Sequence, residues 1–200
     1  MTLGNARNGK LLYHLTKFDN LESIIENGLI ARKILIENNT KFQDVADRNI
    51  ITKREKFGLN KYIPFHFHPY SAFDVAVKES NKCDFIYLCL ERELAIYNKF
   101  KIIPKHPLSF EEVQVLEYDE GMEVINWDLV AIKGNENREV KEAKMAECIT
   151  DLNIPLKLFQ SIAVRDEIIR TKVLKILEEY EMSHKDIFVD IRPTWFNESC

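Results

Sequence analysis

The sequence lacks the signals of a membrane-spanning or secreted protein. Its apolar runs stay well short of the roughly 18–20 residues that a membrane helix needs, and residues 1–10 are polar, unlike a signal peptide. The cysteines form no CxxC pair. Scattered cysteines in a chain of this length are typical of reduced thiols, so we expect a cytoplasmic protein with no disulfide framework at Cys83, Cys89, Cys148 or Cys200.

Glycine and proline are also scarce, with six residues of each among 200. The sequence contains no internal repeat, no low-complexity stretch and no linker rich in Gly, Ser or Pro, so we expect one domain over residues 1–200. Apolar residues make up 46% of the chain, which argues against a disordered protein. The formal net charge is −4, so a nucleic-acid partner would need a local basic patch.

Short apolar segments without a regular strand–helix alternation predict an α+β fold. The most apolar segment, residues 84–90, is expected to form a central strand, and further strands are expected at 11–16, 62–67, 145–150, 159–165 and 187–191. Helices are expected at 19–27, 91–97, 137–144 and 166–180. The charged segment 44–56 is expected to be either a helix or an ordered loop.

Some positions give more specific expectations. Asp19 and Glu22 have the spacing of a capping box, so a helix is expected to begin at Asp19 and to stop at Gly28. Pro64 cannot donate a hydrogen bond to a neighbouring strand, which favours an edge strand or a bulge. Residues 101–119 contain short apolar pieces and two prolines, and are expected to run over the surface.

His14 and Thr16 end the first expected strand, and strand alternation puts both side chains on one face. Such a polar pair can hydrogen-bond a ribose or a phosphate. The alternative is a strand end that caps the following turn.

The densest basic patch of the chain lies between residues 48 and 61. Arginine suits a phosphate clamp because of its fixed fork of donors. A solvated helix face is the alternative, since most runs of charge are of this kind. The patch consists of Arg48, Lys53, Arg54, Lys56 and Lys61.

The aromatic segment 62–70 contains His66 and His68, which a strand would place on one side. No carboxylate or cysteine neighbour completes a ligand set, so no metal site is predicted. The rings can provide a platform for a base or for nicotinamide, because stacking tolerates many partners. Core packing of Phe65 and Phe67 is the alternative, and both can hold together.

Glu147 stands alone in the apolar stretch 146–150. A buried carboxylate is costly unless it is paired or used. It can serve as a general base or form a structural ion pair, and nothing in its neighbourhood decides between these.

Taken in order, these segments resemble the DarT family of toxins, which are DNA ADP-ribosyltransferases. Each block is weak alone, but five blocks in the same order over nearly the whole chain make a specific signal. The matching segments are Leu12–Thr16, Asp19–Leu21, Gly28–Leu29, Asp44–Ile50 with Lys53–Arg54, Tyr62–Phe67 followed by Pro69, Lys144–Ile149, and the tail residues 162–174 and 187–195.

The resemblance implies an ADP-ribosyltransferase-like fold, with a split, mostly antiparallel β-sheet and flanking helices. It implies an enzyme that consumes NAD as a co-substrate, uses no metal, and transfers ADP-ribose to a base of single-stranded DNA. It also implies a toxin with a cognate antitoxin that has ADP-ribosyl-hydrolase activity, and no membrane partner.

By position in the matching blocks, Glu147 corresponds to the catalytic glutamate and Arg54 to an arginine required for activity. A second group is expected to contact NAD: His14, Thr16, Asp19, Asn20, Arg48, Tyr62 and Phe67. A third group is expected to contact DNA: Lys53, Lys56, Lys61, His66 and His68.

Two positions depart from the family pattern. The thymidine-modifying branch commonly continues its aromatic block with a Pro-Arg-Ser-Pro-Met-like stretch, whereas this chain has Pro69–Asp74 (PYSAFD) there, which favours guanine as the target base. Cys148 stands where an aromatic residue is usual.

Two alternative functions remain open. The enzyme can transfer ADP-ribose to RNA or protein instead of DNA, or the chain can be a non-catalytic module that binds NAD or nucleic acid.

Overall fold

The computed structural model describes residues 6–69, 71–80, 83–108, 112–132, 134, 137–183 and 185–196. Tyr70 of the aromatic segment and Cys200 lie outside these residues. The described residues form one eight-stranded sheet in the order β5-β4-β6-β2-β1-β3-β7-β8. Its strands are β1 (Leu11–Lys17), β2 (Ile63–His66), β3 (Phe85–Glu91), β4 (Lys101–Ile103), β5 (Leu116–Glu117), β6 (Glu147–Thr150), β7 (Ser161–Val164) and β8 (Phe188–Ile191).

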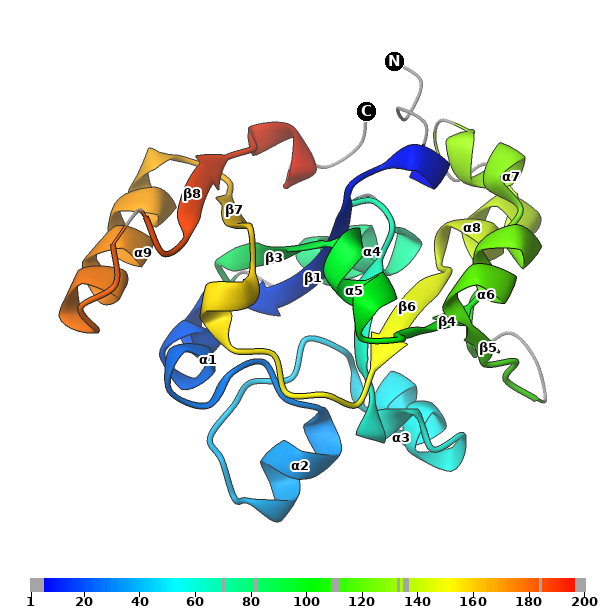
Figure 1. Cartoon of the computed structure of the whole chain (residues 1–200), viewed down its shortest axis with the longest axis horizontal. Helices are drawn as coiled ribbons and strands as arrows, with labels where there is room; N and C mark the ends of the chain where they lie inside the picture. The colour runs from blue at the N-terminus through cyan, green and yellow to red at the C-terminus, as the bar shows by residue number, and fades with distance from the viewer. Residues whose placement is uncertain are drawn as a thin grey trace.

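Helices pack around this sheet (Figure 1). Helix α9 lies against β7 and β8, α6 packs on β4 and β5, and α7 lies against α8. None of the described helices is both long and apolar enough to span a membrane. The helices are α1 (Leu21–Asn27), α2 (Arg32–Glu37), α3 (Arg48–Lys56), α4 (Ala72–Ser80), α5 (Arg92–Tyr97), α6 (Tyr118–Val124), α7 (Trp127–Ala131), α8 (Arg138–Lys144) and α9 (Glu167–Glu179).

The pairing confirms the predicted fold class. Strand β3 is central as expected, because it pairs with β1 over seven residues and with β7 on its other side. Every described strand pair is antiparallel except β7 with β8. The sheet is split at β1 and β2, which share only the register pair Tyr13 and His66, whereas β2 pairs with β6 at four positions.

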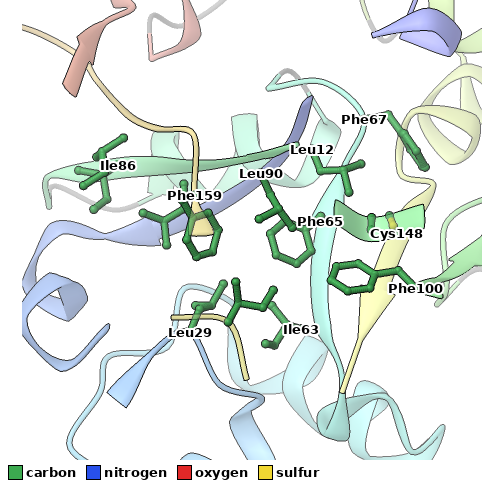
Figure 2. Close-up of a cluster of buried hydrophobic side chains, with 14 of the residues drawn as sticks. Leu12, Leu29, Ile63, Phe65, Phe67, Ile86, Leu90, Phe100, Cys148 and Phe159 are labelled. Atoms are coloured by element: carbon green, nitrogen blue, oxygen red, sulfur yellow. The ribbon is translucent and has the colours of Figure 1, made fainter. Parts of the chain in front are cut away.

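The main core lies where these strands meet the helices, and Phe65 is at its centre (Figure 2). Its fully buried ring lies 6.2 Å from the ring of Phe100 and 6.4 Å from that of Phe159. Alternation along β2 therefore fixes Phe65 in the core and leaves Pro64 and His66 on the other face, where they line a pocket. Packing of β2 thus positions the candidate site.

Some local expectations are wrong. Strand β2 is interior, and its pairing with β6 is continuous through Pro64, so Pro64 lies neither in an edge strand nor at a bulge of that pair. It is tolerated beside the split between β1 and β2. Asp19 does not cap a helix: it belongs to a 3-10 turn, and its carboxylate accepts a hydrogen bond from Gln43. Gly28 does end α1, with φ of 79°.

Residues 101–119 do not simply run over the surface. Lys101–Ile103 forms β4, which pairs with β6 and buries Ile102 and Ile103. Only three residues long, this strand is too short to show a clear alternation in the sequence. Its position matters, because β4 is one of the two strands that flank Glu147.

Candidate active site

Glu147 and Arg54 form the centre of the site. Arg54 Nη1 donates to Glu147 Oε1 at 2.7 Å, and Nη2 donates to Oε2 at 3.1 Å. The side chain of Glu147 is 5% exposed and that of Arg54 is 16% exposed. The lone carboxylate of the apolar stretch is therefore paired, by a bidentate contact with a residue 93 positions earlier in the chain.

Two different elements bring this pair together. Glu147 is the first residue of β6, opposite His66 of β2 and Ile103 of β4. Arg54 comes from α3, whose N-cap Asp47 accepts hydrogen bonds from two backbone N–H groups of the first turn. Ile50 and Ile51 share the pocket-facing side of α3 with Arg54, as helical spacing of three to four residues predicts.

His14 lies in the same pocket and is neutral near pH 7. Its Nδ1 is 2.8 Å from the carbonyl oxygen of Pro64, and because a carbonyl only accepts, Nδ1 carries the proton. Burial lowers the pKa of His14 to about 4, although the hydrogen bond to Pro64 opposes the change. The neutral ring therefore keeps Nε2 as a hydrogen-bond acceptor, which suits a ligand hydroxyl.

Thr16 and Asn20 line the pocket as a connected pair. Asn20 Nδ2 donates to Thr16 Oγ1 at 3.1 Å and to the carbonyl of Gln43 at 2.9 Å. Asn20 Oδ1 accepts from the backbone N–H of Gln43 at 2.8 Å. Asn20 thus holds the backbone of residue 43 at two points, a role that the sequence alone did not reveal.

Two histidines lie near the carboxylate. His66 lines the pocket, and its Nδ1 lies 3.3 Å from the carbonyl of Ala146. His106, which sequence reasoning missed, also lines the pocket and accepts the backbone N–H of Leu108 on Nδ1 at 2.9 Å. Burial lowers the pKa of His106, although Glu147 opposes this, so the neutral ring presents Nε2–H as a donor. The sequence offered no local signal for His106, because β4, the strand before it, is too short to be predicted.

Several expected contact residues lie elsewhere. Among the described residues that line the pocket, Asp19, Arg48, Phe67 and His68 do not appear. Asp19 and Arg48 are exposed. Phe67 is a core residue, 4% exposed, and its ring lies edge-to-face with Trp127 at 5.2 Å and 4.9 Å from Arg92 Cζ, which leaves little of the ring for stacking on a ligand in the pocket.

His68 is only 4% exposed, and burial lowers its pKa to about 3. This burial leaves its ring little surface with which to contact DNA.

The expected DNA-contacting lysines do reach solvent. Lys53 and Lys56 are exposed on α3, and Lys61 is exposed just beyond that helix. Lys61 Nζ lies 5.0 Å from the ring centre of Tyr62, which lines the pocket. The same helix therefore turns Arg54 inward and its lysines outward, as a mixed charged segment on a helix allows.

The pocket combines this polar centre with an apolar wall. Its polar lining includes His14, Thr16, Asn20, Arg54, Tyr62, His66, His106 and Glu147. Its apolar lining includes Ile24, Leu29, Leu35, Phe42 and Val45. Within the described ranges, no three His, Cys, Asp or Glu residues gather in a way that could hold a metal ion. The arrangement can bind a ligand with apolar and hydroxyl-bearing parts and place a carboxylate beside it.

Known proteins match this sequence over most of its length. The DarT family, described as single-stranded DNA thymidine ADP-ribosyltransferase, matches residues 13–197. A DNA ADP-ribosyl transferase from Thermus sp. (strain 2.9) is 24% identical over 204 residues, which cover 92% of this chain and 95% of the relative.

Solved structures agree with this fold. The Thermus sp. 2.9 DarT in complex with ADP-ribosylated single-stranded DNA superposes with a TM-score of 0.78 at 22% identity, covering 94% of this chain and 96% of the other. The same DarT in complex with NAD⁺ gives a TM-score of 0.75 at 20% identity and covers 95% and 98%.

Thermosipho africanus DarTG in complex with ADP-ribose gives a TM-score of 0.74 at 18% identity and covers 94% of this chain but 51% of the other. These structures confirm the ADP-ribosyltransferase-like fold expected from the sequence. Since the family match spans nearly the whole sequence, this chain belongs to the DarT family of DNA ADP-ribosyltransferases.

Proposed function

We propose that this protein cleaves NAD and transfers its ADP-ribose to a base of single-stranded DNA. The observation that carries the proposal is the buried Glu147 carboxylate, held by Arg54 in a pocket that also contains the neutral His14. Relatives of the same fold have been solved with NAD⁺ and with ADP-ribosylated single-stranded DNA, which supports the choice of both substrates. A paired base hides its ring nitrogens, so a single strand is the accessible acceptor.

The proposed chemistry needs one carboxylate. When the bond between nicotinamide and ribose breaks, its electron pair leaves with nicotinamide, and the ribose carbon becomes electron-poor, as in glycoside cleavage. The negative charge of Glu147 stabilises that carbon, and a nucleophilic atom of the base then forms the new bond to it. Glu147 accepts the proton that the base loses.

Arg54 and His14 have supporting roles in this proposal. The Arg54 guanidinium holds the buried Glu147 carboxylate by two hydrogen bonds and provides positive charge for the diphosphate or the incoming base. His14 Nε2 accepts a hydrogen bond from a ribose hydroxyl, since Nδ1 already donates to Pro64.

We infer guanine as the target base. The support is the departure of Pro69–Asp74 from the pattern of the thymidine-modifying branch. Phe73 of this segment lines the pocket, so a change here alters the surface that an acceptor base meets.

Mass spectrometry of oligonucleotides that differ in a single base tests enzyme, acceptor and base together. We expect an added ADP-ribose only on single strands that contain guanine, with release of nicotinamide. Glu147→Ala is expected to abolish transfer while circular dichroism shows an unchanged fold. Label on RNA or protein instead of DNA would overturn the choice of acceptor, and NAD binding without nicotinamide release would indicate a binding module.

We further propose that the protein is the toxin of a pair and acts in the cytoplasm, where NAD and DNA are both present. The support is the family resemblance and the likeness to Thermosipho africanus DarTG, of which this chain covers 51%. Expression of the active chain is expected to stop growth, and expression of Glu147→Ala is not. An ADP-ribosyl hydrolase that removes the label from DNA is expected to restore growth, and persistent arrest despite complete removal would refute the toxin role.

A further inference from the structure

One wall of the pocket is a connecting segment rather than a helix or strand. Residues 42–46, between α2 and α3, all line the pocket. A segment without its own ladder of backbone hydrogen bonds needs other contacts to hold it in one place. Asn20 provides one such point, through its two hydrogen bonds to the backbone of Gln43.

Arg32 provides the second point. From the first residue of α2, its Nε and Nη2 donate to the two carboxylate oxygens of Asp44 at 2.9 Å and 3.2 Å. The same guanidinium lies 6.0 Å from the ring centre of Phe42. Arg32 therefore fixes a charged and an aromatic residue of the wall at once, with the planar fork that only arginine offers.

The third donor of Arg32 reaches the helix that carries Arg54. Nη1 donates to Glu55 Oε1 at 2.6 Å, and Glu55 is the neighbour of Arg54 on α3. The Arg32 side chain is 28% exposed, and its two carboxylate partners are more exposed, Asp44 at 34% and Glu55 at 42%. One guanidinium thus ties α2, the pocket wall and the helix of the catalytic arginine together.

We propose that Arg32 is a positioning residue for NAD, acting through its contacts with Asp44 and Glu55. This inference rests on the proposed function only in taking NAD as the ligand of the pocket. Arg32 sets the distance between the wall at residues 42–46 and Arg54, and so sets the width of the pocket where NAD enters. We call the contacts of Arg32 with Asp44 and Glu55 the Arg32 clamp. Loss of this clamp lets the wall and α3 separate, which weakens NAD binding.

Glu55→Gln gives the sharpest test, because electrostatics and positioning predict opposite signs. Arg32 and Asp44 themselves line the pocket, whereas Glu55 is not among the described lining residues, so Glu55→Gln weakens the Arg32 contacts without removing a side chain that can touch NAD. Removing a negative charge should by itself tighten binding of the anionic dinucleotide. The clamp predicts the reverse: a rise of about threefold in the KM for NAD, the size expected from a partly exposed ion pair.

Three further variants complete the measurement. Arg32→Gln is expected to raise the KM about tenfold, because it loses both carboxylates, while kcat falls less than threefold. Arg32→Lys keeps the charge but not the fork, so its KM is expected between those of wild type and Arg32→Gln. Glu55→Gln added to Arg32→Gln is expected to raise the KM no further, since the contact is already lost and only the favourable effect of removing the negative charge remains.

Glu167→Gln is the matched control. Glu167 pairs with Arg170 at 2.8 Å on α9, which carries no residue of the pocket lining within the described chain. The KM of Glu167→Gln for NAD is expected to equal that of wild type. An unchanged or lower KM in Glu55→Gln, or a fall in kcat that merely follows lost folded protein, would overturn the inference.

Calorimetric titration with NAD separates this inference from the proposed function. If wild type transfers nothing to DNA but binds NAD, the proposed function fails, and the Kd values of the same variants still decide the role of Arg32. If wild type transfers ADP-ribose and the variants keep both Kd and KM, the proposed function stands and the clamp is refuted.

Discussion

Arg54 and Glu147 should contribute unequally to stability, although they form one ion pair. Both hydrogen bonds join the same two groups, but the carboxylate is the more buried, at 5% side-chain exposure against 16% for the guanidinium. Removing one partner of an ion pair leaves the other charge unpaired. The loss of folding free energy is larger when the remaining charge is more buried, because water cannot replace the missing partner. Removing Arg54 therefore strands the charge that water reaches less easily.

The expected magnitudes follow from this geometry. Arg54→Gln leaves a buried carboxylate unpaired, which costs about 3–5 kcal/mol. Glu147→Gln keeps the volume and one acceptor oxygen for Arg54, so its cost is about 1–2 kcal/mol. For a chain of this size each kcal/mol lowers Tm by about 2–4 °C, which gives a drop of roughly 10 °C for Arg54→Gln and of roughly 4 °C for Glu147→Gln.

Thermal unfolding of the two single variants and the double variant at pH 7 measures this asymmetry. The double variant is expected to unfold at a higher temperature than Arg54→Gln, because it no longer holds a buried charge. Arg7→Gln is the control, since Arg7 and Glu123 form an equally short pair of 2.6 Å at 47% and 73% exposure. Equal Tm losses in the two single variants, or a double variant no more stable than Arg54→Gln, would refute the reasoning.

Three other predictions concern DNA, acid and packing. If DNA follows the outward face of α3, the double variant Lys53→Glu, Lys56→Glu should weaken transfer. The slope of the logarithm of DNA affinity against the logarithm of salt concentration should become shallower by about 1.4, and an unchanged slope places the strand elsewhere. Because the pKa of His14 is about 4 in the folded protein and 6.5 when its ring is solvated in the unfolded chain, the stability from its neutral ring is complete above pH 6.5 and falls as pH drops toward 4. Urea unfolding at pH 7, 5.5 and 4.5 should show that the free energy of unfolding falls less with decreasing pH in His14→Asn than in wild type. Equal losses in the two proteins would contradict this. Gly121→Ala puts a Cβ within 2.2 Å of Ile102 Cβ, so it should cost about 1–3 kcal/mol by thermal unfolding with an unchanged KM, and a wild-type Tm would show that the packing yields.

Local sequence identified Glu147 but not its partner. A lone carboxylate among buried strand residues is conspicuous, because burial of an unpaired charge is costly. Its partner Arg54 lies 93 residues earlier, in a segment whose charges also fit a solvated helix. Only the order of the family blocks put the two residues in one site before the structure did.

Long-range pairing explains the errors at Pro64 and at residues 101–119. Proline favours an edge strand in general, but whether a strand lies at an edge depends on its neighbours in the sheet. The neighbours of β2 come from the distant residues 11–17 and 147–150, so the local sequence does not show them. Likewise β4 is a strand because β6 lies beside it, although three residues carry no periodic signal. Sheet order is a tertiary property, which neither propensity nor alternation encodes.

Strand alternation places the side chains of β1 and β2 correctly on the pocket face or the core face. His14 and Thr16 share the pocket face of β1 as predicted, because a strand of seven residues keeps its alternation. Phe67 follows His66, the last residue of β2, and lies in the core against Trp127, on the same face as Phe65 two residues earlier. The alternation that puts Pro64 and His66 at the pocket therefore also puts Phe65 and Phe67 in the core, which is the core-packing alternative for these two rings.

The proposed function explains the buried Arg54–Glu147 pair better than a contribution to stability does. Apolar side chains of the same volume would fill this buried position at no electrostatic cost, whereas an ion pair barely repays its desolvation. Both oxygens of Glu147 are bound to Arg54, so a ribose that reaches the carboxylate must share it with the guanidinium. In the proposed mechanism, charge developing on the ribose competes directly with Arg54 for the same oxygens, and this competition strengthens as the bond to nicotinamide breaks. On this proposal, the position of α3 bears on both NAD binding and the stabilisation of the transition state.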